Sequence, residues 1–199
     1  MKRKALPILV LLIMTLNNTF LQAQSLTEDI KQDIKKEAKK AEKEAKKLEQ
    51  KLKGEVNYKE AVDALLGGAF VLEADKIVFK RGRSAFVSPS TNFVSLADGE
   101  ATVQVAFNSS VIVGSNGIGG VTVDGRASKI EMKTDKKGNV TYSMNILGAR
   151  VSAQVIIKLY KGNNEADVSV IPNFNSERIT LSGVLLPIEK SSIFKGRTL

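Results

Sequence analysis

Apolar and polar residues alternate along most of the chain after residue 69. A period of two is typical of half-buried β-strands, because successive side chains of a strand point to opposite faces. The runs are separated by short turns rich in glycine and asparagine, and short turns join antiparallel neighbours. The predicted strands are 70–79, 92–96, 101–108, 120–123, 127–134, 140–147, 150–160, 165–171 and 178–187.

This pattern predicts an α+β fold that is mainly antiparallel β, an up-and-down meander of about eight or nine strands. Such a meander either closes into a lipocalin-like barrel or remains a curved sheet with a short helix on one face. The alternation is the same in both cases, so both architectures stay open at this point.

A helical period replaces the alternation near the N-terminus. Ser25 and Glu28 fit a capping box, and Gly54 fits a C-terminal stop, which predicts a long charged helix over 24–53. Glu42 and Lys46 are spaced to form an ion pair on it. Its apolar residues follow a heptad stripe: Ile34, Ala38, Ala41, Ala45, Leu48 and Leu52. Because alanine buries little area, we interpret the helix as a solvated spacer that allows weak self-association through the stripe.

A second, shorter helix is predicted over about 58–66. Asn57 and Glu60 repeat the capping pattern, and Gly67 and Gly68 end the helix. We expect its apolar face to pack on the β-domain. That face consists of Tyr58, Val62, Leu65 and Leu66.

The first residues resemble a secretory signal peptide. Lys2, Arg3 and Lys4 precede an apolar run over 6–16, and Ala23 offers a small residue for cleavage. The run is shorter than the ~20 residues of a membrane span, so no stable span is expected after cleavage. The predicted organisation is a signal peptide over 1–23, a charged helical spacer over 24–53 and an antiparallel β-domain over 54–199, in a periplasmic or secreted protein.

The net charge of +9 is spread evenly along the chain. Three basic residues lie in 1–23, ten lysines against seven acids in 24–53, and seventeen basic against fourteen acidic residues in 54–199. Each segment therefore carries +3, and no dense basic patch is present that could neutralise several phosphates together. We expect no nucleic-acid partner.

The chain has no histidine and no cysteine. This composition excludes Ser-His-Asp triads, thiol nucleophiles, disulfides, and imidazole or thiolate metal sites. We expect no cofactor and no metal. Carboxylate chemistry survives, since Glu73 and Asp75 are two residues apart on a predicted strand, although a solvated polar face is the simpler interpretation.

Basic residues gather after the first predicted strand. Lys80, Arg81 and Arg83 could hold a carboxylate or a phosphate, and Arg126 joins them if its turn lies at the same rim. A solvated turn is the simpler interpretation of the cluster. Arg126 fits a structural ion pair with Asp124 equally well.

Five glycines lie in the stretch 113–128. A phosphate-binding loop leads into a helix, whereas the residues after this stretch alternate as strands. We therefore predict a flexible connection over 109–119, with Asn116 as a candidate ligand contact, followed by a tight turn or bulge at Asp124 and Gly125.

Tyr160 and Phe174, both expected near the rim of the meander, are a candidate stacking surface for a ligand. An aromatic residue in a strand more often packs against its cross-strand neighbours.

Several separated strings resemble an exported domain-of-unknown-function family, DUF4251, of Bacteroides-type gut bacteria. The resemblance spans most of 70–197 and implies export, but no activity. The strings are FVLEADKIVFKRGR, TNFVSL, GGVTVDGRAS, LYKG, SGVLLPIE and SSIFKGR.

Two classes of function remain. The chain has few residues suited to catalysis, and its strand pattern resembles that of a barrel. Both features favour a non-enzymatic module that binds an envelope ligand or protein. The alternative is a carboxylate-dependent hydrolase acting on polysaccharide or peptidoglycan.

Overall fold

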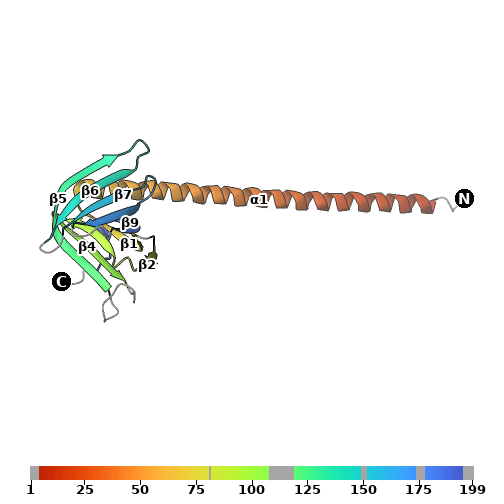
Figure 1. Cartoon of the computed structure of the whole chain (residues 1–199). Coiled ribbons are helices and arrows are strands. Elements are labelled where there is room, and N and C mark those ends of the chain that lie inside the picture. The colour runs from red at the N-terminus through yellow and green to blue at the C-terminus, as the bar shows by residue number, and fades with distance from the viewer. Residues whose placement is uncertain (1–4, 81, 108–118, 149–151, 174–177, 195–199) are drawn as a thin grey trace. The chain divides into compact units, whose positions relative to one another are not determined.

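A helix and nine antiparallel strands make up the protein in the computed structural model, which describes residues 5–80, 82–107, 119–148, 152–173 and 178–194. Eight of these strands close into a barrel, so the mainly β fold is confirmed and the choice between barrel and open sheet is resolved (Figure 1). The elements are α1 (Ala5–Gly67), β1 (Phe70–Phe79), β2 (Ser84–Phe86), β3 (Phe93–Ala97), β4 (Glu100–Phe107), β5 (Gly119–Thr134), β6 (Val140–Leu147), β7 (Ser152–Leu159), β8 (Glu165–Pro172), β9 (Ile179–Pro187) and a short 3-10 helix, η1 (Ile188–Lys190).

The barrel closes between β1 and β9. These strands pair from Phe70 with Pro187 to Phe79 with Ile179, and a register shift between Ala74 and Lys76 marks a bulge in β1. The other edge of β1 is shared, because β3 pairs with its first residues and β2 with its last ones. The bulge bends the strand, which helps a sheet of eight strands to curve into a closed cylinder.

Apolar side chains fill the inside of the barrel. The inward positions alternate with outward ones as predicted, most regularly in β6 and β7. An eight-stranded barrel is just wide enough for its own side chains to occupy the interior. The largest fully buried side chains of this core are Phe70, Leu65, Leu72, Ile77, Leu96, Met144, Ile146, Ile157, Leu159, Leu181 and Leu185.

The two strands predicted over 120–123 and 127–134 are a single strand, β5, and the predicted turn at Asp124 and Gly125 is wrong. A Cβ atom on Gly125 would lie 2.5 Å from the carbonyl carbon of Leu147. The glycine is therefore required for close contact with the end of β6 and not for a reversal of the chain. The irregularity of β5 lies further on, between Ser128 and Glu131.

The two predicted helices are likewise one helix, α1, and neither Ser25 nor Gly54 marks an end of it. The predicted end at Gly67 and Gly68 is correct. Gly68 adopts a positive φ of 63°, and its N–H and that of Ala69 donate to the carbonyls of Leu65 and Ala64. This pair of hydrogen bonds is a Schellman motif, which turns the chain directly into β1.

Gly54 lies inside α1 because the helix passes very close to the turn between β7 and β8. A Cβ atom at this position would lie 2.2 Å from the carbonyl oxygen of Gly162. Glycine normally weakens a helix, so its presence here is explained by contact with the backbone of another element.

Replacing Gly54 with alanine is expected to destabilise the protein by about 1–2 kcal/mol, although alanine is the better helix former. The matched control is Gly67→Ala, because a Cβ atom at Gly67 meets nothing within 4 Å. Urea unfolding of both variants measures the difference. Equal stability of the two variants would show that α1 does not approach Gly162 this closely.

Side chains of α1 close one end of the barrel, which we call the helix end. Ala61, Ala64 and Leu65 are buried in the core, and the Tyr58 hydroxyl donates to the Gly138 carbonyl in the turn between β5 and β6. Burial, with repulsion from nearby carboxylates, raises the pKa of Tyr58. The hydroxyl therefore stays protonated and keeps this contact at neutral pH.

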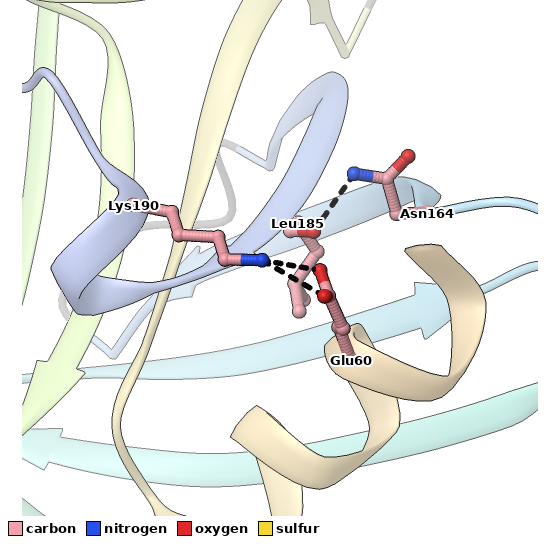
Figure 2. A network of polar contacts seen from close by, with 4 residues as sticks. All are labelled: Glu60, Asn164, Leu185 and Lys190. Atoms are coloured by element: carbon pink, nitrogen blue, oxygen red, sulfur yellow. Dashed lines mark hydrogen bonds and ion pairs between the residues drawn. The ribbon is translucent and has the colours of Figure 1, made fainter. Parts of the chain in front are cut away.

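A polar network joins α1 to the chain after β9 (Figure 2). Lys190 of η1 donates to both carboxylate oxygens of Glu60 at 2.8 Å, and the Asn164 side chain donates to the Leu185 carbonyl at 3.1 Å. Glu60 therefore binds the C-terminal segment and does not cap a helix.

The chain divides into two compact units, Met1–Gln50 and Lys51–Leu199. The predicted pair of Glu42 and Lys46 forms, with 2.7 Å between Oε1 and Nζ. Within the described part of α1, no stretch is long and apolar enough to cross a membrane.

Candidate functional site

The end of the barrel opposite α1 carries a β-hairpin made by β1 and β2, and we call it the hairpin end. The turn is tight: the Gly82 N–H donates to the Phe79 carbonyl, the Phe79 N–H donates to the Arg83 carbonyl, and Gly82 has a positive φ of 79°. β2 pairs with β1 alone in the described part of the sheet. Among the described strands, β2 is therefore the edge strand of the sheet.

Phe86 of β2 is 87% exposed. A large aromatic side chain on a short edge strand gains little from such a position in the isolated protein, because its apolar area remains in water. Aromatic residues are also enriched where proteins bind one another. No strand was predicted here, because a strand of three residues is too short to show a period of two.

Apolar side chains next to the hairpin are only partly buried. Phe79 and Ile179 are opposite each other where β1 and β9 pair, and both contact the barrel core, as does Val87 after β2. The core thus extends to the surface at this end as an apolar floor. Phe86 lies on the other face of the hairpin, because it pairs with Lys76, whereas Phe79 shares its face with the buried Ile77.

Basic residues lie directly beside the strand ends at this end of the barrel. Lys80 and Arg83 are exposed, and Arg178, which directly precedes β9, is exposed as well. Two of the predicted site residues therefore lie at the hairpin end, together with a third basic residue that the sequence pattern did not indicate. Guanidinium groups bind carboxylates with paired hydrogen bonds, which suits an acidic group on a partner.

The connection from β2 to β3 is held by Asn92, which is fully buried. Its side-chain amide donates to the Ser88 carbonyl at 2.9 Å, and its side-chain oxygen accepts the Ala106 N–H at 2.7 Å. The Asn92 carbonyl accepts the Ala74 N–H. These bonds fix the chain that follows Phe86 against β1 and β4.

Arg126 lies elsewhere, on the wall of the barrel. It belongs to β5, its side chain is 82% exposed, and its Nε lies 3.7 Å from Glu100 Oε1. Asp124, the partner considered from the sequence, accepts a hydrogen bond from the Thr102 hydroxyl. The structure therefore does not bring Arg126 to one rim with Lys80 and Arg83.

Tyr160 follows β7 and lies at the helix end. Its hydroxyl donates to Asp167 at 2.6 Å, and Lys158 Nζ lies 5.7 Å from the ring centre. The hydrogen bond to Asp167, with burial and the charge of that carboxylate, raises the pKa of Tyr160. Tyr160 is thus part of a cross-strand polar cluster, distant from the hairpin.

The remaining candidates, Arg81, Asn116 and Phe174, lie outside the described residues, as does the predicted flexible connection except for Gly119.

The two candidate carboxylates make different contacts. Glu73 Oε1 accepts hydrogen bonds from the Ser191 hydroxyl at 2.7 Å and the Ser192 N–H at 2.9 Å, whereas Asp75 is exposed at the bulge of β1. Glu73 therefore anchors the C-terminal segment. In the described residues, no three acidic side chains gather as metal ligands would.

Comparison with known proteins identifies the family. The model of the family described as "Domain of unknown function (DUF4251)" matches residues 52–185. This chain belongs to the DUF4251 family. The match includes the last turns of α1 and extends into β9, so the DUF4251 domain consists of the barrel and the helical segment that closes it.

A solved structure of this family supports the assignment. The crystal structure of a DUF4251 family protein from Bacteroides eggerthii DSM 20697 is similar, with a TM-score of 0.64 and 51% sequence identity. The similarity covers 75% of this chain and 99% of that one. No curated protein matches the chain. The predicted resemblance to this family is thus confirmed.

Proposed function

We propose that this DUF4251 protein is an exported, non-enzymatic binding module of the cell envelope, and that it recognises a protein partner with its hairpin end. The single observation that carries the proposal is Phe86, an aromatic side chain 87% exposed on β2, the edge strand of the described sheet. Aromatic side chains with arginine beside them are typical of the residues that dominate protein interfaces.

The contents of the barrel favour a surface partner over a small ligand held inside. The interior positions are occupied by the protein's own large side chains, and α1 closes the helix end. At the hairpin end, Phe79 and Ile179 form an apolar floor, and Arg83 and Arg178 lie directly beside the strand ends. A segment with an apolar side chain followed by a carboxylate would match both features.

Export is the second part of the proposal. It is supported by the basic residues at the N-terminus, the short apolar run over 6–16 and Ala23. A binding role agrees with the composition, since the chain has no histidine and no cysteine for acid–base or nucleophilic chemistry.

The proposal is tested by charge reversal at the hairpin. Full-length Arg83→Glu, expressed with its own signal sequence in the native host, is expected to lose more than nine-tenths of the partner that copurifies after mild cross-linking. Arg126→Glu is the matched control, because it reverses an equally accessible arginine on the barrel wall. Native mass spectrometry compares the two.

Equal partner recovery from both variants would contradict recognition at the hairpin end. Recovery of a bound small molecule from wild type, with no protein partner, would contradict the protein-binding proposal. A chain that stays in the cytoplasm with an uncleaved N-terminus would contradict export.

A further inference from the structure

The charged part of α1 has an apolar seam that no other described element covers. Ile34 is 62% exposed, and Leu48 and Leu52 are each 59% exposed. The alanines between them, at 38, 41 and 45, are exposed as well. Three large aliphatic side chains on one helical stripe are unfavourable in water, because their burial would release about 25 cal/mol per Å².

The spacing of residues along this seam is symmetric about position 43. In an antiparallel pair of helices, an a position of one chain packs against a d position of the other. If positions whose numbers add up to 86 face each other, Ile34 meets Leu52, Ala38 meets Leu48, and Ala41 meets Ala45. Each pair combines apolar residues, and two of the three include a large one.

The residues at the two ends of the seam carry opposite charges and face each other in the same register. Lys31 occupies the next a position before Ile34, and Glu55 the next d position after Leu52. Their numbers also add up to 86, so an antiparallel pair places each lysine opposite a glutamate. Both side chains are exposed.

The flanking charges favour the same orientation. An antiparallel pair places Lys35 beside Glu49 of the other chain, and Glu37 beside Lys51, each of them twice by symmetry. The like-charge contacts occur at Glu42 and Glu44, each with its own copy. Opposite charges therefore outnumber like charges along the flanks.

A parallel pair would be opposed by the same residues. It would place Glu37 beside Glu42 and Glu44 beside Glu49, and it would bring Lys31 against its own copy. Like charges at such positions destabilise a pair by about as much as opposite charges stabilise it. The sequence of the helix thus discriminates between orientations.

We propose that residues 31–55 of α1 pair with the same segment of a second copy in antiparallel orientation. The lysines at 36, 39, 40, 43, 46 and 47 then remain on the outer face, in contact with water. This proposal is independent of the proposed function, since it involves no residue of the hairpin end.

Charge reversal tests the orientation. In sedimentation equilibrium of the full mature chain, wild type should show a reversible dimer between micromolar and millimolar concentrations. Glu49→Lys is expected to weaken the dimer about five- to tenfold, because it places Lys35 beside a second lysine twice. The double variant Lys35→Glu/Glu49→Lys restores the opposite charges and should recover association. A parallel pair would instead become stronger in Glu49→Lys, since Glu44 would gain an opposite charge.

Single cysteines give a second readout that does not depend on affinity, because the chain has no other thiol. When Lys31→Cys and Glu55→Cys proteins are mixed and oxidised, antiparallel pairing predicts the mixed disulfide between 31 and 55. Identical positions lie about 36 Å apart in this arrangement and should not cross-link. A chain that is monomeric throughout, or disulfides between identical positions, would overturn the proposal.

Discussion

Replacement of Gly183 by alanine should lower the free energy of unfolding by about 2–3 kcal/mol, which is the largest effect that we expect from one added methyl group. A Cβ atom at this position would lie 2.0 Å from the Glu73 carbonyl oxygen and 2.7 Å from Ala74 Cα. Both atoms belong to the backbone of β1, so no side chain can rotate away. The methyl group would force β1 and β9 apart where the barrel closes.

Chemical denaturation of Gly183→Ala beside Gly67→Ala measures this effect. Gly67 has open space around its Cβ position and controls for the change in chain entropy. If the two variants unfold at the same denaturant concentration, β1 and β9 do not approach as closely as the closed barrel requires.

Asn92→Ala should cost about 2–3 kcal/mol. The substitution removes the acceptor of the Ala106 N–H and the donor to the Ser88 carbonyl, and a polar group buried without a partner pays its full desolvation penalty. The variant also releases the connection after β2, so hydrogen exchange of residues 84–91 should become faster.

The control for Asn92 is Asn173→Ala. Asn173 is exposed and its side chain donates to the Ser152 hydroxyl, so its loss should change stability by less than about 0.5 kcal/mol. A similar small effect for Asn92→Ala would mean that water reaches this site and that the connection is not fixed by the side chain.

Local periodicity predicted the strands whose two faces differ most. The predicted bounds of β1 and β6 are the observed ones, because apolar side chains recur at the inward positions of each strand and the residues just beyond its ends break the pattern. The end of α1 was also predictable from the local sequence, because Gly68 takes a positive φ that glycine adopts at low cost.

Two glycines were misread because their role depends on residues far away in the sequence. Gly54 and Gly125 look like a helix stop and a turn, yet each allows a close contact, with Gly162 and Leu147 respectively. Nothing within a local window indicates such a neighbour. A glycine that makes room for a neighbouring backbone and a glycine that reverses the chain cannot be told apart from the adjacent residues.

The candidate site was predicted in part. Lys80 and Arg83 were identified because they cluster in sequence, whereas Arg178 reaches the same end only through the pairing of β1 with β9. Phe86 was missed because a three-residue strand has too few positions to show a period. Arg126 was assigned to a turn between two strands, whereas it lies within the single strand β5.

Photo-cross-linking in living cells tests the hairpin end most directly. Phe86 is replaced by p-benzoylphenylalanine, which retains the aromatic ring, in the full-length exported protein. Tyr160, the exposed aromatic residue at the helix end, receives the same replacement as a control. Irradiation should join a discrete partner to the chain from position 86 and not from position 160. Adducts of equal yield from both positions, or from position 160 alone, would contradict recognition through the hairpin end.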